Sequence, residues 1–344
     1  MLGQRILFVC TPSLKASAHA DRVRASLRAS YWKGRIARLV AEFTEVEPHV
    51  PREVVDAART LADEKKVSVV VALGGGSAIG VGKGVVSWKG RFPTIRRRLI
   101  AIPTTYAGSE MTPIFGSTDR AKAHKSVQRE PAVLPKVVIY DPELTLELSP
   151  ELTASTAMNA LAHCVEACYA PEVMPLVPPA ALEGIRRIVR SLPLCIANGR
   201  NLEAREDLLT GAYLAGFSIG NASMALHHGI CHVLGGKTGV AHGILNAIML
   251  PHVMRFMADA VPDAMGAIAD AMSAGARTRD FAAAPRAVAA LVATLPVPHR
   301  LREAGVPEGV LDSVATEAAS NSRIRKDPKA VTDADVRDLL RAAW

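Results

Sequence analysis

The chain has 344 residues, of which 49% are hydrophobic and 22% charged, which supplies apolar material for the cores of two domains. The formal net charge is +8, but the basic residues are scattered and the longest run is Arg96-Arg97-Arg98, so we expect an anionic cofactor and a small anionic substrate, with no nucleic-acid partner. No signal-peptide layout and no apolar run of roughly 18–20 residues is present, which predicts a cytoplasmic protein without membrane contact.

Strands and helices are predicted to alternate through the first half of the chain. Apolar runs rich in β-branched residues predict strands at 5–10, 67–73, 99–102 and 137–140. Helical spacing predicts helices at 17–27, from Val50-Pro51 onward, and from the glycine run to about Trp88. This alternation predicts a doubly wound, mostly parallel sheet.

After about Leu144 the strand signals vanish. Helices are predicted at 152–169, 180–191, 202–219, 222–234, 243–257, 263–273 and 334–344, the last beginning at Thr332-Asp333. The sequence therefore predicts an α/β dinucleotide-binding domain over 1–145 and an all-α substrate domain over 146–344, with a cleft between them.

A glycine run, Gly74-Gly75-Gly76-Ser77, lies between a predicted buried strand and a helix. Glycines let a diphosphate approach the backbone N–H groups of a helix N-terminus, and we expect Ser77 to cap the helix and donate to a phosphate oxygen. The spacing departs from GxGxxG, and no Lys-Ser/Thr ending marks a P-loop. A tight strand-to-helix turn is the alternative.

The ribose end of a dinucleotide lacks its usual acidic partner in this sequence. No acid closes the first strand, which ends at Cys10-Thr11-Pro12. Space near Thr11, Ser13 and Lys15 would accept a 2′-phosphate, so we expect little discrimination between NADH and NADPH.

Hydroxyl side chains cluster after the predicted strand at 99–102. Thr104, Thr105 and Ser109 surround Gly108, and the carboxyl end of a strand is where α/β sheets bind ligands. Local turn chemistry accounts for such residues equally well.

Histidines gather in the second half. His228 and His232 share one helix face, His242 follows a glycine-rich loop, and His163 lies four residues after Asn159. Such a set predicts metal ligands, a proton donor, or both. The alternative is a group of unrelated helix residues. A divalent cation bound by three histidines usually gains a carboxylate ligand as well. The equivalent position here is Asn159, whose amide is a neutral and poorer ligand, although three histidines alone can hold zinc.

Several colinear segments resemble the iron-containing alcohol dehydrogenase superfamily. They are GGGS at 74–77, PTT at 103–105, YDPELT at 140–145, NALAHCVEACYA at 159–170, and HHGICHVLGG with AHGILNAIMLPH between His227 and His252. TTYAGSEMTPIFG at 104–116 and the asparagine of MNALAH resemble its maleylacetate reductase branch. The resemblance implies a dehydroquinate synthase-like architecture and a homodimer.

The resemblance also assigns roles to residues. It implies that Gly74, Gly75, Gly76 and Ser77 bind the diphosphate, with Thr104, Thr105 and Ser109 near the nicotinamide. It implies that His163, His228, His232 and His242 line the substrate end. In metal-dependent relatives the metal is held by positions that correspond to Asn159, His163, His228 and His242. Replacement of the acid is typical of the maleylacetate branch, which works without a bound metal.

The implied reaction reduces the alkene of maleylacetate and yields 3-oxoadipate in aromatic catabolism. We expect His232 or His242 to donate the proton, and Asn159 with Lys237 or Arg129 to hold the substrate. A zinc- or iron-dependent alcohol or aldehyde dehydrogenase of the same superfamily is the alternative. A catalytically silent anion-binding relative is a third reading. Gly229 departs from the branch, which usually has a basic residue there.

Overall fold

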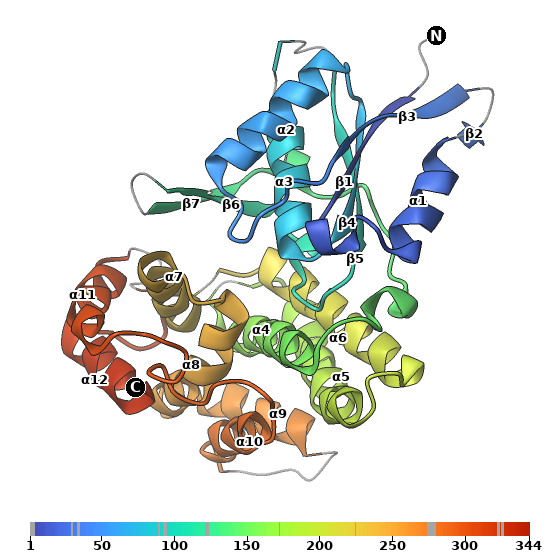
Figure 1. The fold of residues 1–344 in the computed structure, drawn as a ribbon. Coiled ribbons are helices and arrows are strands. Elements are labelled where there is room, and N and C mark those ends of the chain that lie inside the picture. The colour runs from blue at the N-terminus through green and yellow to red at the C-terminus, as the bar shows by residue number, and fades with distance from the viewer. Residues whose placement is uncertain are drawn as a thin grey trace. The chain divides into compact units, whose positions relative to one another are not determined.

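The computed structural model describes residues 4–28, 30–32, 35–88, 90–91, 95–120, 124–171, 173–223, 225–273, 280–321, 324 and 327–344. The chain forms two compact units (Figure 1). The first contains the chain up to Thr105 together with Ser109–Thr145. The second contains Leu146–Trp344 together with Tyr106–Gly108, a three-residue excursion that the sequence did not predict.

The first unit contains a six-stranded sheet in the order β2-β3-β1-β4-β5-β8. Its strands are β1 (Gln4–Cys10), β2 (Ser30–Trp32), β3 (Arg35–Phe43), β4 (Val69–Gly74), β5 (Arg98–Pro103) and β8 (Val137–Val138). All neighbours pair in parallel except β2 with β3. The mostly parallel sheet confirms the predicted fold class.

Helices cover both faces of this sheet, as a doubly wound fold requires. Leu7 and Val9 of β1 point into a core with Val54, Val55 and other residues of α2 (Arg52–Glu64) and α3 (Gly76–Ser87). The alternate residues Phe8 and Cys10 point into the opposite core, with Ala20 of α1 (Ala18–Arg28). Figure 1 shows α1 on one side of the strands, and α2 and α3 on the other.

The strand order creates a switch point between β1 and β4. From β1 the chain passes through α1 and β2 to β3 on one side of β1, and then through α2 to β4 on the other side. In open α/β sheets, ligands bind outside the carboxyl ends of the strands at such a point. Thr11 follows β1 and Gly74 ends β4, so both lie at this position.

Two strands form a separate antiparallel hairpin, β6 (Ile114–Asp119) with β7 (His124–Arg129). Neither they nor β3 were predicted. Their sequences, IFGSTD, HKSVQR and RIARLVAEF, interrupt the apolar runs with charged and small polar residues. Strands whose sequence lacks a continuous apolar run give a weaker pattern than fully buried parallel strands.

The second unit is helical in the part that the structure describes, apart from its loops. Its helices are α4 (Pro150–Tyr169), α5 (Val177–Ala197), α6 (Leu202–Gly220), α7 (Leu226–Thr238), α8 (His242–Met257), α9 (Pro262–Met272), α10 (Ala283–Ala293), α11 (Leu311–Ser320) and α12 (Asp333–Ala343). Short 3-10 helices occur in the chain at Pro12–Leu14, Ser109–Met111, Pro131–Val133, Pro142–Thr145 and Glu308–Val310. The all-α prediction is confirmed, although α10 and α11 were not predicted.

The predicted start at Thr332 is confirmed by a capping box, in which Thr332 accepts from the backbone N–H of Asp335 and Asp335 accepts from that of Thr332. The helix predicted from residue 222 begins instead at Leu226, after Ala225 in an extended conformation. Among the described helices, none combines the length and apolar character needed to cross a membrane.

Candidate active site

The glycine loop lies against the ends of both neighbouring strands. The backbone N–H of Thr104 donates to the carbonyl of Gly74 at 3.1 Å. A Cβ added at Gly75 would approach Thr105 Cγ2 to 2.9 Å, and one added at Gly74 would lie 3.2 Å from Thr11 Cγ2. The structure thus brings Thr11, Gly74, Gly75, Thr104 and Thr105 together at the carboxyl edge of the sheet.

The N-terminus of α3 opens directly from this loop. Gly75 is its N-cap, and an added Cβ at Gly76 would meet nothing within 4 Å. The expectation that Ser77 caps the helix is wrong, because Gly75 is the N-cap and Ser77 lies in the first turn. The first-turn N–H groups lack intrahelical partners, and with the open face at Gly76 they fit a diphosphate.

Lys83, which the sequence analysis did not single out, joins the glycine-loop helix to the segment after Gly108. Its fully buried ammonium donates to the carbonyls of Ser109 at 2.5 Å, Thr112 at 2.8 Å and Ile114 at 2.7 Å. Three carbonyl acceptors match the three N–H bonds of the ammonium, whereas a neutral amine has only two. A lysine inside the apolar stretch GVGKGVV was the signal available in the sequence.

Burial and charge act on Lys83 in opposite directions. Burial lowers the pKa of Lys83 to about 7, while the nearby charge of Glu110 raises it. Burial also raises the pKa of Glu110, whose carboxyl accepts a hydrogen bond from Tyr140 Oη at 2.8 Å. The hydrogen bond from Lys83 to the carbonyl of Ser109, a predicted nicotinamide neighbour, fixes the backbone of Ser109 against α3.

The tip of the threonine loop is anchored in the second unit. Arg205 Nη1 donates to Tyr106 Oη at 2.9 Å, and both side chains are buried. Asn159 Nδ2 donates to the carbonyl of Ala107 at 3.1 Å. Gly108 has a φ of +74°, and a Cβ there would lie 3.1 Å from the backbone of Gly216. The conformation and the close approach both favour glycine.

Four predicted histidines lie together in the second unit. His163 stacks on His228 with ring centroids 4.7 Å apart, and His232 stacks on His242 at 4.8 Å. The centroid of His228 is 5.6 Å from that of His242 and 6.3 Å from that of His232. Burial, with the neighbouring imidazoles, lowers the pKa of His163 well below its usual value. The geometry brings the four imidazoles together, and their roles stay predictions.

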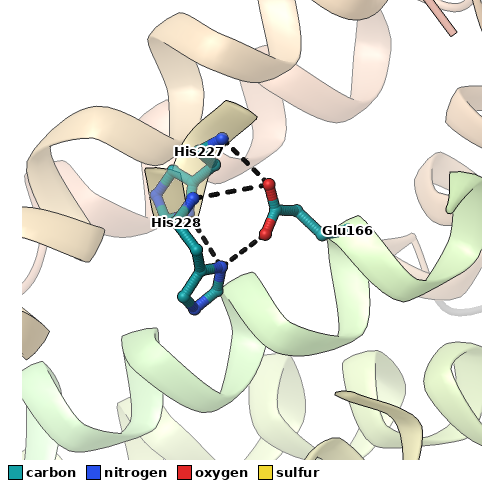
Figure 2. Close-up of side chains that lie close together, drawn as sticks. All are labelled: Glu166, His227 and His228. Carbon is teal, nitrogen blue, oxygen red and sulfur yellow. Dashed lines mark hydrogen bonds and ion pairs between the residues drawn. The ribbon is translucent and has the colours of Figure 1, made fainter. Parts of the chain in front are cut away.

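A buried carboxylate, missed in the sequence, contacts His228 of this cluster (Figure 2). Glu166 of α4 accepts from His228 Nδ1 through one oxygen. Its other oxygen accepts from the backbone N–H groups of His227 at 2.9 Å and His228 at 3.4 Å, in the first turn of α7. These contacts explain why the helix starts at Leu226, because the first-turn N–H groups find their acceptor there. An acid three residues after His163 in an apolar helix was the available signal.

Asn159 is held on both sides of its amide. Besides donating to Ala107, it accepts through Oδ1 from Asn246 Nδ2 at 2.7 Å. The backbone carbonyl of Asn246 in turn accepts from His227 Nε2 at 3.3 Å. A carboxylate at position 159 could not donate to Ala107, so this network suits the amide.

The described side chains do not reproduce an acid-plus-three-histidine metal set. Position 159, where the family resemblance implies an acid in metal-dependent relatives, is an asparagine whose oxygen already accepts a hydrogen bond. Of the residues that the structure describes, one set has three ligand atoms within 4.8 Å of one another, and it is Glu166, His227 and His228. The oxygens of Glu166 are satisfied there by N–H groups, so we derive no chemical step through a metal.

The predicted substrate-binding cations lie on other elements. Arg129 is the last residue of β7, in the first unit. Lys237, in the last turn of α7, forms an ion pair with Glu317 at 2.9 Å.

A Cβ at Gly229 would approach Ile324 Cδ1 to 2.7 Å, which accounts for the lack of a large side chain there.

Comparisons with known proteins cover nearly the whole chain. Residues 1–142 match the family model for iron-containing alcohol dehydrogenase, and residues 153–344 match the model for the C-terminal part of the Fe-containing alcohol dehydrogenase family. Maleylacetate reductase of Burkholderia cepacia is 37% identical over 344 residues, which are 100% of this chain and 90% of that protein. Maleylacetate reductase 1 of Rhodococcus opacus is 38% identical over 296 residues, 86% of this chain and 78% of that protein.

Solved structures agree with these matches. The crystal structure of maleylacetate reductase from Agrobacterium tumefaciens has a TM-score of 0.85 at 34% identity, and the match covers 99% of this chain and 89% of that one. The structure of a 1,3-propanediol oxidoreductase has a TM-score of 0.91 at 29% identity, and the match covers 99% and 92%.

Proposed function

The chain belongs to the iron-containing alcohol dehydrogenase family, in its maleylacetate reductase branch, and from this premise we propose that it reduces maleylacetate to 3-oxoadipate with NAD(P)H. The observation that carries the proposal is the environment of Asn159. The amide occupies the position of the metal-binding acid, and it is hydrogen-bonded to Ala107 and Asn246 beside four gathered imidazoles. Such a site supplies hydrogen-bond donors and protons without a metal.

The chemistry follows from the substrate. Maleylacetate is a dianion with an alkene conjugated to a ketone, and NAD(P)H, when bound, supplies a hydride to the alkene carbon β to that ketone. The alkene electron pair moves toward the ketone and forms an enolate. An imidazole N–H stabilises the enolate oxygen, and a second imidazole gives its proton to the α carbon, which completes 3-oxoadipate. We propose His232 or His242 as this donor.

The cofactor half of the proposal uses the first unit. The open face at Gly76 and the first turn of α3 would hold the diphosphate, with Gly74, Gly75 and Ser77 around it and Thr104, Thr105 and Ser109 beside the nicotinamide. The Thr11 hydroxyl lies 3.2 Å from that of Ser13, and no acid replaces them at the end of β1, which supports use of both NADH and NADPH. Asn159, Arg129 and Lys237 are the proposed partners of the substrate, and Lys237 also pairs with Glu317.

Family membership supports three further parts of the proposal. We propose that the enzyme acts in aromatic catabolism, resides in the cytoplasm and forms a homodimer. It takes a small anionic substrate and has neither nucleic-acid nor membrane partners.

A kinetic assay with two substrates tests the function. NADH and NADPH oxidation would be followed with freshly prepared maleylacetate and, separately, with a simple aldehyde, before and after EDTA treatment. We expect rapid, chelator-insensitive turnover of maleylacetate with either cofactor and little turnover of the aldehyde. Chelator-sensitive aldehyde reduction without maleylacetate turnover would establish the metal-dependent alternative instead.

A further inference from the structure

We infer that Glu166 is a positioning residue that selects the tautomer of His228, so that Nδ1 carries the proton and Nε2 is left as a bare acceptor. The catalytic consequence rests on the proposed function, whereas the tautomer itself follows from the hydrogen bonds around His227 and His228. Figure 2 shows Nδ1 of His228 directed at Glu166 and the other ring nitrogen pointing away from it.

The first step concerns His227. Its Nε2 lies 3.3 Å from the backbone carbonyl of Asn246, which only accepts, so Nε2 must carry a proton. Its Nδ1 lies 3.5 Å from Nδ1 of His228, so only one of these two nitrogens carries a proton directed at the other. A neutral imidazole has one N–H, so Nδ1 of His227 is a bare acceptor.

The second step concerns His228. Its Nδ1 faces a carboxylate oxygen of Glu166 and lies 3.5 Å from the bare Nδ1 of His227. Both neighbours are acceptors, so the proton belongs on Nδ1 of His228. In the neutral ring Nε2 is then unprotonated, and within the described chain this buried atom has no hydrogen-bond partner.

The third step concerns the rigidity of Glu166. Its second oxygen accepts two backbone N–H groups from the first turn of α7, and the side chain is fully buried. Rotation would leave both N–H groups buried without an acceptor, which disfavours any other rotamer of Glu166. One oxygen accepts from two backbone N–H groups and the other faces Nδ1 of His228, an arrangement that suits a carboxylate.

The consequence is an acceptor at a defined place inside the histidine cluster. Nε2 of His228 belongs to a ring that stacks on His163 and lies 5.6 Å from His242, centroid to centroid. An acceptor at this place orients a donor next to it, whether an imidazole N–H, a water or a substrate hydroxyl. In the proposed reaction Glu166 therefore acts through His228 and does not touch the substrate.

Long-range ¹H–¹⁵N correlation NMR on the full chain near pH 8 tests the tautomer, with His228 assigned by loss of its signals in His228→Gln. We expect wild type to show the Nδ1–H form of His228. In Glu166→Gln the amide oxygen can still accept from the backbone, while its –NH₂ donates to Nδ1, so we expect the Nε2–H form. An Nε2–H tautomer in wild type overturns the inference, and this arm holds even if Glu166→Gln fails to fold.

Kinetics then separate positioning from folding. We expect Glu166→Gln to lower kcat by roughly 10²-fold, with the KM for NADH unchanged. The matched control is Glu151→Gln, an exposed acid at the start of the same helix, which should behave as wild type. An unchanged kcat in a folded Glu166→Gln with a switched tautomer contradicts the positioning role. Absence of maleylacetate turnover in wild type would refute the proposed function and leave the NMR result intact.

Discussion

Each unit buries a charged side chain, and hydrogen bonds compensate the loss of water around it in both cases. In the first unit the Lys83 ammonium is surrounded by carbonyls of Ser109, Thr112 and Ile114. In the second unit the Glu166 carboxylate is surrounded by N–H groups of His227 and His228. Each charge joins segments distant in sequence, and each would be costly to bury without these partners.

The difference lies in what is left over. Every N–H of the Lys83 ammonium faces a carbonyl oxygen, so all of its donors are satisfied. The role of Lys83 is therefore to hold the backbone of these segments in place. The hydrogen-bond chain from Glu166 ends instead at Nε2 of His228, which has no protein partner among the described residues. A completed polar set indicates an anchor, whereas an incomplete one indicates a site, because an unpaired buried polar atom needs a ligand to satisfy it.

The largest expected effect is on kcat, when His228 is replaced. His228→Gln should lower kcat for maleylacetate by roughly 10²–10⁴-fold, because the acceptor that orients the proton donor is lost. Steady-state kinetics with NADH would measure it, beside a thermal melt. His299→Gln, an exposed histidine of the same unit, is the control and should keep full activity. A kcat within a few-fold of wild type would place the chemistry elsewhere.

The next largest effect is expected on the free energy of unfolding, when Lys83 is replaced. Lys83→Met removes the ammonium and leaves three buried carbonyls unsatisfied, so the free energy of unfolding should fall by about 3–5 kcal/mol. Urea denaturation measures this. Lys65→Met, an exposed lysine on the same unit, should change it by less than about 0.5 kcal/mol. A Lys83→Met variant as stable as wild type would show that the hydrogen bonds of Lys83 do not stabilise the first unit.

Glycines of α3 allow the same contrast within one helix. Gly84→Ala would place a Cβ 2.5 Å from Val55 Cγ1, and should cost about 1–3 kcal/mol in unfolding free energy. Gly76→Ala meets no protein atom within 4 Å, and should leave stability unchanged. If that space holds the diphosphate, Gly76→Ala raises the KM for NADH by roughly ten-fold, about 1.4 kcal/mol. An unchanged KM would move the diphosphate away from Gly76.

The smallest effect is expected at an exposed polar pair. Thr332→Ala removes half of the capping box of α12 and should cost about 1 kcal/mol. The Thr332 hydroxyl, with its backbone N–H, lowers the pKa of Asp335. A carboxyl whose folded pKa lies below its unfolded value adds stability above the unfolded pKa and loses it as pH falls through the folded pKa. The destabilisation by Asp335→Ala should therefore shrink in urea melts between pH 6 and pH 2, and an increase would contradict the sign.

Local sequence patterns predicted a large part of the molecule. The β-branched runs predicted β1, β4 and β5, because strands buried on both faces need continuous apolar residues. The glycine run and the His228–His232 spacing predicted where the loop and the cluster lie, since both depend on neighbours a few residues apart. Each was readable without knowing the tertiary fold.

Long-range partners could not be read in the same way. Glu166 meets His227, 61 residues later, and Asn159 meets Asn246, 87 residues later. Lys83 finds its carbonyls only once α3 packs beside the loop after Gly108. A charged residue inside an apolar helix signals that a partner exists, but the fold decides which one.

Metal analysis of the purified enzyme is the most direct test of the central claim, that gathered imidazoles work here without a metal. Protein prepared without chelators would be measured by elemental mass spectrometry, and its maleylacetate turnover would be compared before and after metal removal and after addition of zinc or iron. We predict far less than one metal ion per chain and the same kcat throughout. One tightly bound ion per chain, whose removal abolishes turnover and whose return restores it, would contradict the account.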